Sequence, residues 1–382
     1  MRITIIGWYG TETIGDRAIL AGLIYLFSKC FDLFEIKLGC LGTLLSDRTV
    51  AEDSGFYRHC SANKLKSIEL FDSRYKKNLD DSISWADLVV VGGGPLMDIE
   101  PMYMLQYALK KSKSYRKKSI VAGCGMGPLK TEKFKKIATN IIDLSDLTIF
   151  RDNKSLELYR AFSYVNNRTY SSIDPGVFAT KCYQDINKDI VDNDNYIAIN
   201  FRQPPVREYE GLGHINDDFF IEFLSNFLEN NSISIRLVPM STNWMGWDDR
   251  LFLNRICRKV GSGNISVYNK PLSLIETMRV YSEADYCIGM RFHAVLLQTL
   301  LNGKNYVMDY TDPRTGKIIG LLNQLGLRDI MSERYFSLID GNNIPQVNLQ
   351  VLDKIIVDNN MIADYENVYV DNISKLVFEI MS

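Results

Sequence analysis

The chain has 382 residues, which is longer than a single domain of ordinary size and favours two domains. Hydrophobic residues make up 46% of it and charged residues 24%, a balance that argues against a disordered chain or an integral membrane protein. The formal net charge is -2 without a long run of Lys or Arg, which excludes the extended basic surface that binds nucleic acids or anionic membranes.

The first apolar segment, Arg2–Ile6, is too short for a signal-peptide core or a membrane span. No later segment reaches about 18 uninterrupted apolar residues, so we expect a cytoplasmic protein without a transmembrane segment, with peripheral membrane association left open. Seven cysteines are scattered and never form a Cys-x-x-Cys pair, which argues against a disulfide scaffold and a zinc site. We therefore expect buried thiols and no bound metal.

Short apolar segments alternate with longer amphipathic segments in the first half of the chain. The predicted strand and helix pairs are 2–6 with 16–30, 88–91 with 103–113, and 119–122 with 132–144, followed by a strand at 147–150. This alternation predicts βαβ units and a parallel sheet. The strands are continuous runs of Val, Ile and Leu, as expected where both faces of a sheet are covered.

A polar and acidic stretch between Tyr183 and Asn195 marks the predicted boundary between two domains. Beyond it, predicted strands at 196–200, 233–238, 265–268, 286–289 and 305–309 alternate with helices at 217–229, 247–260, 272–282 and 293–301. The sequence predicts an α/β fold of two Rossmann-like domains, residues 1–184 and 196–350, with a cleft between them. Residues 351–382 are predicted as a C-terminal helical segment that could pack back on the first domain.

Glycine-rich loops follow three predicted strands of the first domain. They contain Gly10, Gly15, Asp16, Gly92, Gly93 and Gly94, with a further loop at 123–129. Because open α/β sheets bind ligands at the carboxyl ends of their strands, these loops are candidate ligand contacts. Their spacing is not Gly-x-Gly-x-x-Gly, so a dinucleotide site is not supported. Two structural alternatives stay open, an N-cap at Asp16 and a tight turn at the three successive glycines.

An arginine and a histidine, Arg291 and His293, lie two positions apart where a predicted strand gives way to a helix. A helix N-terminus, a guanidinium and an imidazole together suit a phosphate or carboxylate that undergoes proton-coupled chemistry. The alternative is a histidine packed under the helix without a chemical role. Arg202, Arg314 and Lys317 also follow predicted strands, and are either further cations of the site or solvated surface charges.

In chain order, these segments resemble the polysaccharide pyruvyl transferase family. The similarity extends from residue 3 to about residue 326, and the ordered set of motifs is more specific than any one of them. The motifs are Gly10-x4-Gly15-Asp16, Gly92-Gly93-Gly94-Pro95, Gly125-x-Gly127-Pro128, Arg151-Asp152 with Ser155, Asp174-Pro175, Arg202, Val238-Pro239 and Gly289-Met290-Arg291-Phe292-His293-Ala294.

The resemblance implies a GT-B-like fold and a pyruvyltransferase that uses phosphoenolpyruvate as a co-substrate, without a cofactor. The implied reaction forms a pyruvate ketal on a sugar of a surface or exopolysaccharide precursor and releases phosphate. The implied acceptor is a saccharide that is lipid-linked or nucleotide-linked, on the side of the first domain and its glycine loops. No nucleic acid partner is expected.

By the same resemblance, the donor site contains Arg202, Arg291, Phe292 through its backbone, and His293. Arg291 and His293 are the expected catalytic residues, with His293 as the general acid or base. Either Arg314 or Lys317 supplies a further cation, because the Tyr-Asp-x-Lys pattern of the family is stretched here into the segment 310–317.

Two other functions stay open on the same residues. A nucleotide-sugar glycosyltransferase of GT-B type would use Arg202 and Arg291 to hold a diphosphate. A non-catalytic saccharide-binding protein would keep the same scaffold without the chemistry. Fold alone does not separate these functions.

Overall fold

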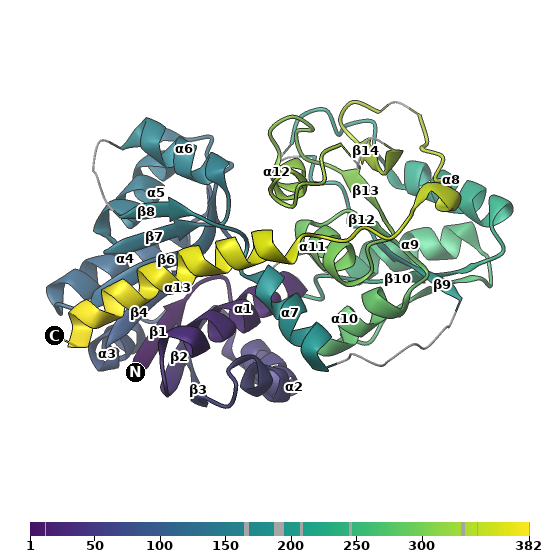
Figure 1. Ribbon diagram of the computed structural model, residues 1–382. Coiled ribbons are helices and arrows are strands. Elements are labelled where there is room, and N and C mark those ends of the chain that lie inside the picture. Colours follow the sequence, from purple (N-terminus) through teal and green to yellow (C-terminus); the bar gives the residue numbers. More distant parts are fainter. Residues whose placement is uncertain are drawn as a thin grey trace. The chain divides into compact units, whose positions relative to one another are not determined.

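The computed structural model describes residues 1–11, 13–163, 168–186, 195–206, 209–243, 247–329, 333–341 and 343–381. The chain divides into two compact units (Figure 1). The first contains Met1–Glu12, Asp16–Cys182 and Asn359–Ser382, and the second contains Thr13–Gly15 and Tyr183–Asp358. Most of the predicted boundary stretch, residues 187–194, lies outside the described residues.

The first unit is built on a parallel sheet with the strand order β3-β2-β1-β4-β6-β7-β8, and the short β5 pairs with β6. Its strands are β1 (Arg2–Ile6), β2 (Phe34–Cys40), β3 (Leu65–Asp72), β4 (Leu88–Gly92), β5 (Pro95–Leu96), β6 (Lys118–Met126), β7 (Leu147–Phe150) and β8 (Thr169–Ser171). The helices that belong wholly or mainly to this unit are α1 (Ile14–Cys30), α2 (Thr43–Cys60), α3 (Lys76–Trp85), α4 (Met102–Ser114), α5 (Glu132–Leu144), α6 (Asn153–Phe162), α7 (Gly176–Ile186) and α13 (Asn359–Met381).

The second unit contains a parallel sheet with the order β11-β10-β9-β12-β13-β14. Its strands are β9 (Tyr196–Asn200), β10 (Ser234–Leu237), β11 (Ile265–Val267), β12 (Tyr286–Gly289), β13 (Asn305–Asp309) and β14 (Tyr335–Ser337). Its helices are α8 (Asp217–Asn230), α9 (Asp249–Val260), α10 (Leu274–Glu283), α11 (Phe292–Leu301), α12 (Lys317–Gln324) and the short 3-10 helix η3 (Leu349–Val351). Both units therefore have the Rossmann-like architecture expected from the sequence.

Burial explains why the strands could be recognised from sequence. Strand β4 is a continuous apolar run, β9 is apolar up to Asn200 at its end, and every described residue of both is buried. In β1 only Arg2 is exposed. These strands lie in the middle of their sheets, where helices cover both faces. The edge strand β3 is half polar and is exposed at Lys66, Ser67 and Glu69, so it has no comparable apolar run.

Two predicted helix starts were wrong by two residues, for the same physical reason. Helix α9 begins at Asp249 rather than at residue 247, because Asp248 stays extended and caps the helix by accepting from the Arg250 N–H. Helix α10 begins at Leu274 rather than at residue 272, because Ser273 and Glu276 form a reciprocal capping box. Capping residues keep non-helical backbone angles, so a helix starts after them.

The C-terminal helical segment is shorter than predicted, and its helix α13 belongs to the first unit. The Tyr369 hydroxyl donates to the Ile173 carbonyl over 2.8 Å, and Ser172 Oγ donates to the Tyr365 carbonyl over 2.7 Å. Figure 1 shows α13 running along the sheet of this unit. Residues at opposite ends of the sequence thus complete one core.

Two helical glycines of the first unit provide a matched test of packing. A Cβ on Gly22 in α1 would collide with the carbonyl of Pro175, whereas a Cβ on Gly55 in α2 would meet no atom within 4 Å. We expect Gly22→Ala to lower the free energy of unfolding by about 1–3 kcal/mol through overpacking. Gly55→Ala should raise it by up to about 1 kcal/mol through helix propensity. Urea denaturation of both variants measures the difference, and equal effects would contradict the close approach of α1 to Pro175.

Candidate functional site

The candidate site lies at the point where the strand order of the second sheet reverses, between β9 and β12. These strands are neighbours, and β13 pairs with the other side of β12. Arg202 follows β9, Arg291 and His293 follow β12, and Lys317 follows β13 at the start of α12. In open parallel sheets this carboxyl edge at the reversal is where ligands bind.

A buried asparagine joins the loops at this edge. Asn200, the last residue of β9, is fully buried, and its Nδ2 donates to the Val238 carbonyl over 2.9 Å. Its Oδ1 accepts from the Arg291 N–H over 3.0 Å. One side chain therefore fixes the loop after β10 and the start of α11 relative to β9.

Asp249 makes the strongest set of contacts at the site. Its carboxylate, only 1% exposed, accepts from the backbone N–H groups of Met240 and Ser241, both over 3.1 Å. It also accepts from Arg291 Nε over 2.8 Å and from Arg291 Nη2 over 2.6 Å. Such a bidentate pair fixes both the charge and the plane of the guanidinium. The orientation of Arg291 is thus set by the protein.

Two cationic side chains lie near the buried ring of Tyr310, the residue directly after β13. Arg202 Cζ and Lys317 Nζ each lie 5.4 Å from the centre of that ring, and the ring of Tyr209 packs against it edge-on. Burial alone would raise the pKa of the Tyr310 phenol, but the charges of Lys317, Arg202 and Arg291 outweigh burial and lower it. The electrostatic potential at the phenol is therefore positive.

Arg202 is held rigidly within this cluster. Its backbone N–H points to the sulfur of Met290 over 3.5 Å, and its guanidinium lies over Tyr310. The Nε–H of Arg202 is buried and has no hydrogen-bond partner among the described residues. A buried donor without a partner is costly, so an acceptor in this position would be bound favourably.

The two candidates for the additional cation have different surroundings. Lys317 is half-buried and lies over Tyr310, whereas Arg314 is exposed in the turn before α12. The backbone N–H of Arg314 donates to Asp312 over 2.8 Å, which stabilises that turn. The structure brings Lys317 to the cluster of cations, and it leaves the Arg314 side chain at the surface.

His293 lies in the first turn of α11, next to the backbone of Phe292. The two rings pack edge to face with their centres 5.0 Å apart. A Cβ on Gly15 would collide with the imidazole, so a glycine at this position leaves room for His293. The backbone of residues 13–14 is attached to the same unit, since Thr13 forms a bridge with Ser241 and the Ile14 N–H donates to Met240 over 3.0 Å. Gly15 is thus placed beside the imidazole.

Packing accounts for several glycines in the loops of the first unit, and their contact with an acceptor stays a prediction. Gly93 and Gly94 have φ values of 93° and 70°, which favour glycine, and a Cβ on Gly94 would collide with the Trp8 indole. Gly92 contacts Leu23 closely, and Gly10 has a φ of 82°. These contacts account for Gly92-Gly93-Gly94 as a tight turn, the structural alternative raised from the sequence.

Asp16 is not the N-cap of α1. The helix already begins at Ile14, so Asp16 lies in its first turn. Its carboxylate accepts a hydrogen bond from the Thr11 hydroxyl over 3.0 Å. The N-cap alternative at Asp16 and the predicted helix start at residue 16 are therefore both wrong, because Ile14 and Gly15 already have helical backbone.

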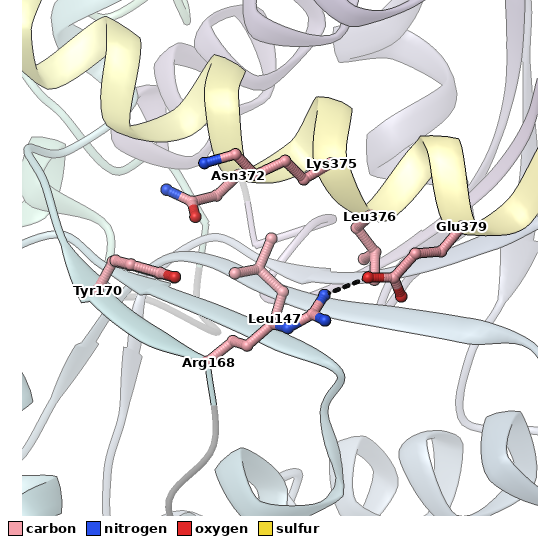
Figure 2. Close-up of a pocket in the computed structure, with 7 residues that line it drawn as sticks. All are labelled: Leu147, Arg168, Tyr170, Asn372, Lys375, Leu376 and Glu379. Carbon is pink, nitrogen blue, oxygen red and sulfur yellow. Dashed lines mark hydrogen bonds and ion pairs between the residues drawn. The ribbon is translucent and has the colours of Figure 1, made fainter.

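A separate cavity of about 340 Å³ lies in the first unit between α13 and strands β7 and β8 (Figure 2). It is lined by Leu147, Arg168, Tyr170, Asn372, Lys375, Leu376 and Glu379. Arg168 and Glu379 form an ion pair of 2.6 Å across it. Leu147 is the first residue of β7, so this cavity lies near the amino end of that strand rather than at the carboxyl edge.

Three residues at the site were missed from the sequence: Asn200, Asp249 and Tyr310. Asn200 is a polar residue at the end of an apolar run, which was the available signal for a fixed loop. Asp248 and Asp249 are two adjacent acidic residues at a predicted helix start. The neighbouring sequence does not show which of them caps the helix and which binds Arg291. The described residues contain no group of three or more His, Cys, Asp or Glu side chains suited to a metal ion.

A buried carboxyl group, Asp309, ends strand β13 beside this cluster. Burial raises its pKa to about 6, although hydrogen bonds from Thr311 and Tyr335 favour the charged form. In the unfolded chain its pKa is about 3.9, so the native state binds the proton more tightly. The stabilisation from that proton is complete below pH about 4 and is lost as the pH rises through about 6.

Asp309→Asn should remove this pH dependence. We expect the free energy of unfolding of the wild type, relative to the variant, to fall by on the order of 3 kcal/mol between pH 4 and pH 7. Urea titrations of both proteins at four pH values in this range measure the difference. Parallel curves would show that Asp309 does not change its proton affinity on folding.

Comparisons with known proteins agree on the fold. The UDP-GlcNAc 2-epimerase from Methanocaldococcus jannaschii has a TM-score of 0.59 and 11% identity, with 99% of this chain and 100% of that chain covered. The Rickettsia bellii UDP-N-acetylglucosamine 2-epimerase has a TM-score of 0.59 and 11% identity, with 100% and 96% covered. At such identities the similarity shows the fold alone, which is a two-domain Rossmann-like fold of GT-B type.

The described residues include no helix that is both long and apolar enough to cross a membrane. A search of curated protein sequences finds no match to this chain. The sequence model of one family, described as polysaccharide pyruvyl transferase, matches residues 14–313. That range contains Gly92-Gly93-Gly94, Arg202, Arg291 and His293, whereas Gly10 and Lys317 lie outside it. The chain therefore belongs to the polysaccharide pyruvyl transferase family.

Proposed function

We propose that this protein transfers a pyruvyl group from phosphoenolpyruvate to a pair of hydroxyls on a saccharide, forming a pyruvate ketal and releasing phosphate. The observation that carries the proposal is the cluster of Arg202, Arg291 and Lys317 around Tyr310, at the reversal point of the second sheet. Phosphoenolpyruvate has a phosphate and a carboxylate on a three-carbon skeleton, and binding it requires several cations close together.

The arrangement favours different roles for the cations. Arg202 offers a buried Nε–H to an acceptor, so it suits an anionic oxygen of the donor. Arg291 is fixed by Asp249 and lies at the start of α11, where the helix N-terminus adds positive potential. Lys317 is the additional cation, because it contributes to the field at Tyr310 and the exposed Arg314 does not.

His293 is the proposed general acid or base. A proton added to the methylene carbon of the donor makes C2 electrophilic, and one sugar hydroxyl adds to C2 as it loses its proton. The second hydroxyl then displaces phosphate at C2, which closes the ketal ring and breaks the C–O bond to phosphate. An imidazole exchanges protons near neutral pH, so His293 can donate the first proton or accept one from a hydroxyl.

The family match supports a saccharide acceptor, and we extend it to a lipid-linked or nucleotide-linked precursor of a surface polysaccharide or exopolysaccharide made in the cytoplasm. The reaction requires no cofactor or metal, since the leaving phosphate comes from the donor itself. A rival function is the use of a nucleotide sugar. It is favoured by the similarity in fold to epimerases named for UDP-GlcNAc, and opposed by the match to a pyruvyl transferase family.

Ligand-induced stabilisation separates the two donors. Phosphoenolpyruvate at about 100 times its Kd should stabilise the protein by about 2.7 kcal/mol, seen as a rise in Tm, whereas UDP-GlcNAc should have little effect. Arg202→Ala should weaken phosphoenolpyruvate binding by about 10–100-fold, since a hydrogen bond to a charged group is lost. Arg314→Ala is the matched control and should bind as the wild type does. Stabilisation by UDP-GlcNAc alone would overturn the proposal.

Removal of the imidazole tests the chemistry. His293→Ala should lower phosphate release from phosphoenolpyruvate and a saccharide acceptor by about 10²–10⁴-fold while the variant still binds phosphoenolpyruvate. The control is His214→Ala, because His214 is exposed and its Nε2 forms a hydrogen bond with the Gly341 carbonyl, away from the cluster of cations. Turnover of His293→Ala within threefold of the wild type would reject this role.

A further inference from the structure

An exposed tryptophan in the second unit precedes Asp249, the partner of Arg291, by two residues. Trp247 is 67% exposed, whereas Trp8 and Trp85 in the first unit are buried or half-buried. A large aromatic side chain left in solvent forgoes a substantial hydrophobic stabilisation. The indole is therefore accessible to another molecule.

The two residues that follow Trp247 are both anchored. Asp248 caps α9 and forms an ion pair of 2.6 Å with Arg250, whose Nη2 also donates to the Thr242 carbonyl. Asp249 donates its N–H to Ser241 over 2.9 Å and binds Arg291 through its carboxylate. The backbone directly after Trp247 is therefore held in place.

The same chain connection limits the distance between Trp247 and the proposed donor site. Two residues span at most about 7.6 Å between Cα atoms, so Trp247 lies within that distance of Asp249. The carboxylate of Asp249 is in direct contact with the guanidinium of Arg291. An indole ring at this distance is within reach of a sugar whose hydroxyls approach the donor.

The backbone of Trp247 is strained. Its φ is 63°, a left-handed conformation that is uncommon for residues other than glycine and unfavourable for a bulky side chain. Asn would adopt this conformation more readily, and Gly would do so without strain. A strained and exposed tryptophan next to a cluster of cations is expected where the ring serves binding rather than stability.

We propose that Trp247 is a platform on which a hexopyranose ring of the acceptor stacks, and that it thereby determines which saccharides are accepted. This inference rests on the proposed function. The apolar C–H face of a pyranose matches the flat indole, while the hydroxyls at its rim stay available for the donor. The small, highly charged donor has no such face, so it is not the molecule that covers the ring.

Three variants test the platform. Trp247→Asn removes the ring but fits the left-handed backbone, Trp247→Phe keeps an aromatic face, and Leu251→Ala, 71% exposed on α9, is the matched control. With methyl hexopyranosides as acceptors, we expect the acceptor KM of Trp247→Asn to rise about tenfold and that of Trp247→Phe by less. The KM for phosphoenolpyruvate and the values for Leu251→Ala should stay as in the wild type. The Tm of Trp247→Asn should be equal or higher.

A binding measurement without turnover separates this inference from the proposed function. The same glycosides should shift the tryptophan emission of the wild type, and Trp247→Phe should abolish the shift. A shift that depends on Trp247, without phosphate release by the wild type, would support the platform and reject the transferase reaction. Phosphate release with an acceptor KM in Trp247→Asn within twofold of the wild type would overturn the platform, as would an emission shift retained in Trp247→Phe.

Discussion

One buried carboxylate holds the carboxyl edge of the second sheet together. Asp249 binds the backbone after β10 and the guanidinium of Arg291 after β12, so two loops and one cation depend on a single charge. Removing either partner of such a pair leaves a buried charge uncompensated, which is far more costly than the pair itself is stabilising. The position of Arg291, and with it the start of α11 that carries His293, follows from this constraint.

The middle of each sheet could be predicted from the sequence, because β4 and β9 are buried along their whole length and are apolar except for Asn200 at the end of β9. The alternation of strands and helices then gave the fold class. Strand β3 was missed because this edge strand is half polar. The helix starts at 249 and 274 were misplaced because a capping residue cannot be told by composition from the helix that follows it. Local composition does not contain that information.

Some residues of the candidate site could be selected from the sequence and others could not, for a related reason. Arg202, Arg291 and His293 could be selected because each follows a recognisable strand, and parallel strands bring their carboxyl ends together. The same reasoning left Arg314 and Lys317 as alternatives for the further cation. Tyr310 and Asp249 act through partners that are distant in the sequence. Arg202 lies over the ring of Tyr310, and Arg291 binds the carboxylate of Asp249. Conversely, Gly94 was a candidate ligand contact in the sequence. The structure shows that a Cβ at this position would collide with Trp8, so packing alone accounts for the glycine.

The placement of α13 has a consequence for synthesis of the protein. The first unit needs residues 359–382, whereas the second unit is almost entirely one continuous stretch that emerges from the ribosome earlier. Domains fold as units while the chain grows, so the second unit can complete its core first. Until then the surface around Ile173 that Tyr369 later covers remains open to water, and to chaperones that bind exposed apolar surface. The order of assembly is therefore opposite to the order in which the two units begin.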